Sequence, residues 1–259
     1  MTPVPLSAIA AHLDTLLSTG SIPDYPQALN GVQLEHRGPV HGIATAVDVS
    51  RRTIAGTIDA GANLLIVHHG MFWGGATRIA GRYYERLATL FAHDIAVYSV
   101  HLPLDAHARF GNSALLAATF GLTPSAGFAK HQDIFCGVRG HSDLPTAELA
   151  ARVEQFAAAH GHTLVTTPYR ADRRSMHWAI CSGAGAGHDT LREATALGID
   201  TLIVGEGPHW TAVDAEDLGI VVMYAGHYAT ETVGVRAIGD ELTRVFGLPA
   251  TFIAAPTGL

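Results

Sequence analysis

The chain is poor in cysteine, in basic side chains and in long apolar runs. Its two cysteines, Cys136 and Cys181, are too few for a disulfide framework, so we expect free, buried thiols in a reducing compartment. With 16 Lys+Arg against 23 Asp+Glu, the net charge is -7. This balance argues against a nucleic-acid partner, because neutralising phosphates requires a basic face. No apolar run reaches the roughly 18 residues that a membrane-spanning helix needs, so no membrane partner is expected.

The first residues, MTPVPLSAIAAHLDTLL, lack the basic region and the small-residue cleavage site of a signal peptide, so a cytoplasmic protein is expected. Charged residues make up only 15% of the chain and apolar residues 48%. This composition excludes intrinsic disorder and predicts extensive burial. The length of 259 residues suffices for one large domain or two modest lobes with a hydrophobic core.

Apolar runs of strand length alternate with segments of helical periodicity. The runs 42–49, 63–69 and 200–205 are nearly continuous in apolar residues, as strands buried on both faces are. Helical periodicity fits segments such as 83–93 and 232–247. This alternation predicts an α/β fold with mainly parallel sheets flanked by helices.

The two halves of the chain follow the same pattern. In each half, a strand, a helix and a second strand lead to a strand that is followed by His-x-x-x-acid, and then to a helix ending in Phe-Gly-Leu. His101–Asp105 aligns with His227–Glu231, and His69 aligns with Glu206. We interpret this as an internal duplication. The alternative is chance similarity between strand–helix units.

The duplication predicts two related lobes, residues 1–124 and 125–259, with the C-terminal part of the second lobe packing back on the first. Segment 125–176 has no counterpart in the first half. We expect it to add a strand and a helix to the second lobe.

Histidine is abundant, with 16 residues. It is the commonest metal ligand, but so many histidines also form pairs by chance, so only motifs that combine ligands count. One motif is His68-His69-Gly70 at the end of a buried strand, where ligand sites of open α/β sheets lie. Adjacent side chains inside a strand point to opposite faces. At a strand end the backbone turns, and the two histidines can bind two ions, one each. The alternative is that one histidine caps a loop and the other packs in the core.

Two further motifs supply carboxylates. Pro103 prevents a helix from running back through His101–Asp105, so we expect a shaped loop with Asp105 as a fixed carboxylate. His227 and Glu231 are four residues apart and share one face of the first turn of a predicted helix. The alternative for Glu231 is a residue that interacts with the helix dipole.

These motifs together give three neutral nitrogen ligands and two carboxylates: His68, His69, His227, Asp105 and Glu231. A carboxylate can bridge two ions roughly 3.5–4 Å apart, an arrangement that activates water in hydrolases. Mixed ligation of this kind suits iron, manganese, nickel or zinc. The sequence therefore predicts two divalent metal ions per chain.

The order of these motifs resembles a known family. The segments Asp24-Tyr25, Asn30–Glu35, HHGMFWG, HLPLDAH, SGAGAG and GHYATE occur as in the NGG-one-interacting-factor-three-like proteins, also called GTP cyclohydrolase I type 2 homologues or dinuclear metal-centre hexameric proteins. The resemblance covers essentially the whole chain, in the short form without an insertion domain. It implies a two-lobed α/β/α fold assembled into a toroidal homohexamer.

The resemblance also assigns the ligands. It implies that one ion is held by His68, His227 and Glu231, and that the other is held by His69, Asp105 and Glu231, with Glu231 as the bridge. The chain departs from its relatives at Val204-Gly205-Glu206, where relatives more often begin with Thr or Ser.

Two functions are weighed. The first is a dinuclear metal-dependent hydrolase of an unknown small-molecule substrate, a nucleotide or phosphoester by the family's cyclohydrolase label, in which Glu206 or His101 moves protons. The alternative is a non-enzymatic metal-binding scaffold or regulator. Five ligands shared by two ions leave coordination positions for water, which favours the hydrolase. The Gly183–Gly187 run is either a tight turn, which we favour, or an anion contact.

Overall fold

The computed structural model describes residues 3–259, which divide into two compact units. The first unit ends at Leu104 and also takes in Gly234–Ala255, whereas the second comprises Asp105–Val233 and Pro256–Leu259. The boundary of the compact units therefore lies before the one drawn at 124/125 from the sequence. Both units are α/β, which confirms the predicted fold class. No helix within the described residues is long and apolar enough to cross a membrane.

The first unit contains a five-stranded sheet in the order β13-β4-β5-β6-β2. Every neighbouring pair is parallel except β6 with β2, so this sheet is mainly parallel, as predicted. A small antiparallel pair, β1 with β3, accompanies it. The strands are β1 Val4–Pro5, β2 Gly31–Leu34, β3 Pro39–Val40, β4 Ile43–Asp48, β5 Leu64–His69, β6 Ala96–Ser99 and β13 Ala250–Phe252.

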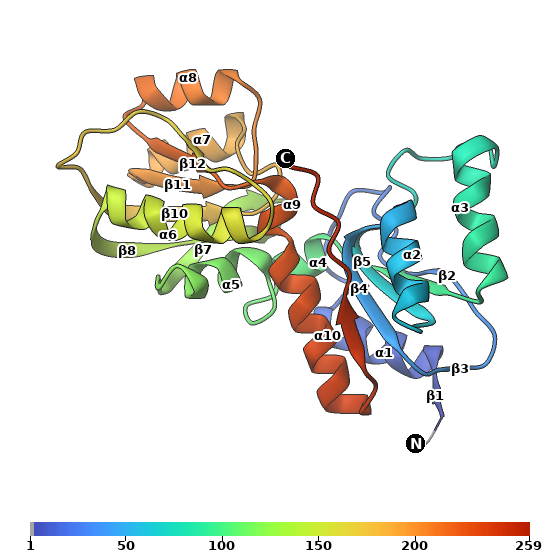
Figure 1. Cartoon of the computed structure of the whole chain (residues 1–259). Helices are drawn as coiled ribbons and strands as arrows, with labels where there is room; N and C mark the ends of the chain where they lie inside the picture. Colours follow the sequence, from blue (N-terminus) through green and yellow to red (C-terminus); the bar gives the residue numbers. More distant parts are fainter. Residues whose placement is uncertain (1–2) are drawn as a thin grey trace. The chain divides into compact units, whose positions relative to one another are not determined.

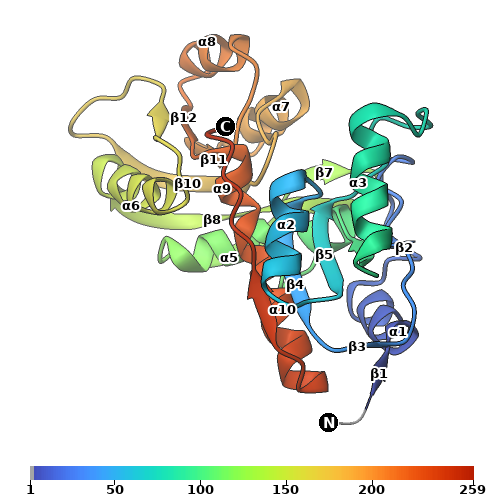
Figure 2. The ribbon, with the colours of Figure 1, turned by 45° about the vertical axis from the view of Figure 1, so that its right-hand side comes forward.

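Helices cover both faces of this sheet. Ala44 and Val97 pack with the apolar residues of α2 (Arg51–Asp59) and α3 (Gly81–Ala92). Figure 1 and Figure 2 both show α2 lying along β4 and β5. The next residue in each strand faces the other way. On that side Tyr98 donates a hydrogen bond to Asp14 of α1 (Leu6–Leu17), 2.7 Å long, and Thr45 contacts α10 (Thr232–Phe246).

The second unit contains a six-stranded sheet in the order β7-β8-β10-β11-β12-β9. Only β10 with β11 and β11 with β12 are parallel, so this sheet is mixed rather than mainly parallel. The cause is segment 125–176, which contributes to four strands, β7, β8, β9 and the start of β10, and to one helix instead of one strand and a helix. Its strands β7 and β8 form a hairpin, and a tight turn makes neighbouring strands antiparallel. The strands are β7 Pro124–His131, β8 Ile134–Pro145, β9 Val165–Thr166, β10 Arg174–Cys181, β11 Thr201–Val204 and β12 Val221–Tyr224.

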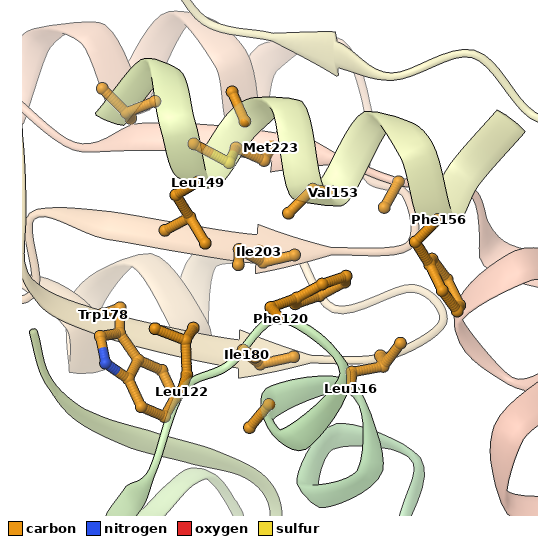
Figure 3. Packing of buried hydrophobic residues seen from close by; sticks show 14 of the residues in the cluster. Leu116, Phe120, Leu122, Leu149, Val153, Phe156, Trp178, Ile180, Ile203 and Met223 are labelled. Carbon is orange, nitrogen blue, oxygen red and sulfur yellow. The ribbon is translucent and has the colours of Figure 1, made fainter. Parts of the chain in front are cut away.

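Alternating residues of the second sheet pack on opposite faces. Trp178 and Ile203 lie in a core with α5 (Asn112–Thr119) and α6 (Thr146–Ala159), shown in Figure 3. Their neighbours Ala179 and Leu202 pack on the other face with α7 (His188–Ala196) and α8 (Trp210–Asp217). Because α5 contributes to this core, residues 105–124 belong to the second unit. Because apolar side chains fill both faces of the sheet, the polar groups lie at the ends of its strands.

The predicted repeat is present as a pattern of strands. The first sheet contains three adjacent parallel strands in chain order, β4, β5 and β6, and the second contains β10, β11 and β12. Helices connect the strands in each set. The polar motifs follow the carboxyl ends of strands in both units: β5 and β6 in the first, β11 and β12 in the second.

Candidate metal centre

Three histidines of the first unit lie together. His68 and His69 end β5, and His101 follows β6, the next strand of the sheet. One ring nitrogen from each of the three lies within 4.8 Å of the others, a spacing at which the three rings can share metal ions. His68 is fully buried, whereas His69 and His101 are partly exposed. The strand-end placement predicted for the His68-His69 pair is therefore present, and His101 joins it.

The rings of His68 and His69 are each fixed through Nδ1. Nδ1 of His68 lies 3.0 Å from the carbonyl oxygen of Val100, and Nδ1 of His69 lies 2.9 Å from Oδ1 of Asp48. A carbonyl or carboxylate oxygen can only accept, so Nδ1 carries the hydrogen in both rings. Nε2 is then the nitrogen with a lone pair for a metal, which is the usual arrangement of metal-binding histidines.

Asp48 reaches His69 because of strand register. The two residues are opposite each other in the parallel ladder of β4 and β5. Asp48 was not among the residues predicted from the sequence. The sequence does contain a feature that could have identified it. Asp48 is the single carboxylate at the end of the apolar run 42–49, and this run forms the strand that pairs with the His68-His69 strand.

His101 is held by a buried polar network. Its Nδ1 lies 2.9 Å from Oδ1 of Asp24, and its backbone N–H donates to Oδ1 of Asn30, 2.8 Å away. Asp24 also accepts hydrogen bonds from the backbone N–H groups of Tyr25 and Leu102 and from Nδ2 of Asn30. Burial raises the pKa of Asp24, but the hydrogen bonds and charge of His101, with Asn30 and Leu102, lower this pKa below its ordinary value on balance. Asp24 is therefore a carboxylate that orients His101.

The loop after His69 places an aromatic ring over the histidines. The ring of Trp73 lies 4.7 Å from that of His101 and 5.7 Å from that of His69, nearly perpendicular to both. Gln33 fixes the start of this loop, since its Oε1 accepts from the backbone N–H of Met71 at 2.7 Å. Gly70 lies against this side chain, because a Cβ there would meet the amide of Gln33 and displace it.

In the second unit, His227 lies between two carboxylates. Its Nδ1 is 2.8 Å from Oε1 of Glu206, and its Nε2 is 3.2 Å from Oε2 of Glu231, which is 3% exposed. Burial lowers the pKa of His227, but the hydrogen bonds and charges of Glu231 and Glu206 outweigh this and raise it to about 9. The pair of carboxylates therefore stabilises a positive charge at this position.

Glu231 lies at a break between two helices. His227–Thr230 forms a separate short helix, α9, and Glu231 follows it before α10 begins. The predicted i, i+4 relation between His227 and Glu231 is present, although the two residues do not lie in one continuous helix. The burial of Glu231 also differs from the exposure of an ordinary first-turn glutamate, the alternative weighed from the sequence.

The Gly183–Gly187 run forms a tight turn against these residues. Gly183 has a left-handed backbone with φ +63, and its N–H donates to Oγ1 of Thr230 at 3.0 Å. A Cβ at Gly183 would collide with Oε1 of Glu231. The glycine therefore serves both the left-handed backbone angle and the close approach of a carboxylate.

Asp105 begins the second unit and is also held in place. Its Oδ1 accepts from Nδ2 of Asn112 at 2.9 Å and from Oγ of Ser182 at 3.4 Å. The loop predicted around Pro103 is instead a four-residue helix, α4 (Leu102–Asp105). Proline is tolerated in a first helical turn, where its missing N–H has no helical partner, so it did not exclude a short helix here.

The donor set of each unit fits divalent transition metals. The first unit offers imidazole nitrogens, and the second offers one imidazole and the carboxylates of Asp105 and Glu231. Imidazole and carboxylate ligands suit iron, manganese, nickel and zinc. A protein with a histidine-rich cluster after parallel strands of an α/β sheet belongs to the class of candidate metal-binding proteins.

The comparisons with known proteins place the chain in one family. The model of the Duf34/NIF3 (NGG1p interacting factor 3) family matches residues 4–257, and the chain belongs to this family. A "GTP cyclohydrolase 1 type 2 homolog" of Deinococcus radiodurans is 36% identical over 250 residues, covering 95% of this chain and 92% of that protein. Its namesake in Halobacterium salinarum is 40% identical over 244 residues, covering 92% and 94%.

Solved structures show the same fold over the full length. Protein ybgI, whose function is described as unknown, has a TM-score of 0.88 at 33% identity and covers 99% of this chain and 100% of its own. The protein TTHA1606 from Thermus thermophilus has a TM-score of 0.83 at 32% identity, with coverage of 99% and 100%.

Proposed function

We propose that this protein is a dinuclear, divalent-metal-dependent hydrolase of a small-molecule substrate. One ion is assigned to His68, His227 and Glu231. The other is assigned to His69, Asp105 and Glu231, so that Glu231 bridges the two.

The proposal rests on one kind of contact that several of the histidines share. In His68, His69 and His227, Nδ1 is bound to an oxygen acceptor, at 3.0, 2.9 and 2.8 Å. His160 and His162 also bind carbonyl oxygens through Nδ1, but among the described residues neither belongs to a group of ligand atoms close enough to hold an ion. Where a histidine does belong to such a group, the acceptor fixes the tautomer and the ring direction and makes Nε2 a stronger ligand.

When bound, two such ions lower the pKa of a water molecule and polarise the substrate. The residues of the chain then supply orientation and proton transfer. His101, bound at Nδ1 to the carboxylate of Asp24, is assigned the proton shuttle, because that carboxylate fixes the direction of the ring. Glu206 holds His227 through Oε1, and we assign to the same carboxylate the role of general base.

The substrate class follows the names of the relatives. They are called GTP cyclohydrolase 1 type 2 homologs, so nucleotides and other phosphoesters are the first compounds to test. For assembly we propose a homohexamer, and the molar mass from light scattering at micromolar concentration tests it. A monomer would contradict this assembly without affecting the metal assignment.

The deciding experiment combines metal analysis with a substrate screen. Purified protein is assayed by mass spectrometry of the metals and then with phosphoester, nucleotide and amide substrates. We expect up to two divalent ions per chain and turnover that chelation abolishes and metal restores. Two bound ions without turnover of any substrate class would favour the alternative, a metal-binding scaffold or regulator, and absence of metal would refute both.

A further inference from the structure

Two exposed histidines of the second unit face each other across neighbouring strands. His141 on β8 and His177 on β10 are partners in the antiparallel ladder. Their ring centroids are 4.7 Å apart and their planes are nearly perpendicular, at 82°. Directly opposed residues of an antiparallel pair have Cβ atoms roughly 4.5–5.5 Å apart, so both side chains can reach one small ligand.

The backbone of His177 lies beside a bulge, at which β8 has one residue more than β10. The register between β10 and β8 shifts between Ser175 and His177. The N–H groups of Met176 and His177 both donate to Oδ2 of Asp200, at 3.0 and 2.8 Å. A bulge disrupts the ladder locally, and here the Asp200 carboxylate binds the N–H groups of β10 beside it. These hydrogen bonds fix the backbone from which the His177 side chain extends.

The ring nitrogens of His141 and His177 are not used in hydrogen bonds within the described part of the fold. Within residues 3–259, no ring nitrogen of His141 or His177 takes part in a hydrogen bond or ion pair. This differs from His68, His69, His101 and His227, whose Nδ1 atoms are all engaged. Both imidazoles of the exposed pair therefore keep their nitrogens for an external ligand.

We propose that His141 and His177 form a separate surface site for one late transition-metal ion, of the class Cu²⁺, Ni²⁺ or Zn²⁺. Two neutral imidazoles are good ligands for these ions, and water completes the coordination. The carboxylate of Asp200, adjacent to His177, adds a favourable negative charge. With two protein ligands, this site binds more weakly than a centre with three ligands per ion, and affinity follows the order Cu²⁺ above Ni²⁺ and Zn²⁺.

This site is distinct from the metal centre proposed above. Asp200 immediately precedes β11, whereas Glu206, which binds His227, follows the other end of that strand. Four residues of strand span roughly 10 Å at about 3.3 Å per residue. The exposed pair therefore lies near the amino ends of the parallel strands, whereas Glu206 follows their carboxyl ends.

The test uses Cu²⁺ and the full-length protein with its native metals bound. At about pH 7.5, Cu²⁺ is titrated into the wild type and into His141→Asn/His177→Asn, with electron paramagnetic resonance as the readout. We expect one additional Cu²⁺ per wild-type chain, with nitrogen couplings from two imidazoles. The double variant should lack it, and each single variant should bind at least tenfold more weakly. His41→Asn/His93→Asn, which removes two exposed histidines from the other unit, should bind like the wild type.

Two outcomes of the Cu²⁺ titration would contradict the proposed site. Equal Cu²⁺ binding by the wild type and the double variant would overturn the site, as would many weak sites in the wild type without a two-nitrogen signal. Both side chains are exposed, so the substitutions should leave the fold intact, and circular dichroism checks this. If an asparagine variant misfolds, His141→Gln and His177→Gln replace it, and the nitrogen count in the wild type is an independent measurement.

Discussion

Oε1 of Glu206 lies 2.8 Å from Nδ1 of His227, and Nε2 of the same ring lies 3.2 Å from Oε2 of Glu231. One carboxylate thus contacts Nδ1 of the imidazole, and the other contacts Nε2 on the opposite side of the ring. The contact between Glu206 and His227 leads to a prediction for substitutions of Glu206.

Glu206→Gln should keep the bound metals and lose most of the turnover found with any substrate. The glutamine oxygen still accepts from Nδ1 of His227, so the ring stays oriented, whereas the proton-accepting charge is lost. Glu206→Ala removes both and should weaken metal binding about 10–100-fold as well. Metal analysis and turnover of the two variants check this, and unchanged turnover in Glu206→Gln would leave Glu206 with an orienting role only.

Glu231→Gln should lose more than half of the bound metal, because the proposal assigns Glu231 to both ions. Metal content per chain after gel filtration is the measurement. Glu216→Gln, at an exposed position in the same unit, is the control and should keep its metal. Full metal content in the double variant His68→Ala/Glu231→Gln would contradict the ligand assignment.

Asp48→Ala should lower metal affinity about 10–100-fold while leaving the fold in place, because it frees Nδ1 of His69 from its acceptor. The measurement is competition with a chelator of known affinity. Asp59→Ala, at an exposed aspartate of the same unit, should behave like the wild type. An Asp48→Ala protein with unchanged affinity would mean that the hydrogen bond does not support a ligand.

Metal-free protein should lose stability as the pH rises through about 9. The pKa of His227 is raised from 6.5 to about 9 in the fold, so the folded state binds this proton more tightly than the unfolded chain. The resulting stabilisation is fully present below about pH 6.5 and is lost between there and about pH 9. Melting temperatures in the presence of a chelator check this, and His227→Gln should remove the dependence. The same slope in that variant would assign it to other groups.

Gly183→Ala should destabilise the protein and reduce its metal content, whereas Gly198→Ala should only destabilise it. Both glycines have left-handed backbones, with φ +63 and +65, so alanine costs about 1–2 kcal/mol at either position. A Cβ collides with Glu231 only at position 183, since nothing lies within 4 Å of one at 198. Equal metal content in the two variants would show that the turn does not shape the site.

The sequence by itself determined the α/β class and the kinds of candidate ligand. Both depend on local features: the alternation of strand and helix periodicity, and the side chains that follow a strand. His68 and His69 end a strand whatever it pairs with, and His227 and Glu231 approach each other because four residues separate them along the chain. The repeated strand–helix–strand pattern is local in the same sense, and three parallel strands in chain order appear in each sheet.

The tertiary structure decided which groups contact these candidate ligands. Asp48 contacts His69 through the register of two strands, and Asp24 reaches His101 from a segment far away in the sequence. No local pattern encodes such pairings, since they depend on how strands align and loops close. The division of the chain is decided in the same way: residues 105–124 join the second unit because α5 packs in its core, and β13 joins the first because it pairs with β4.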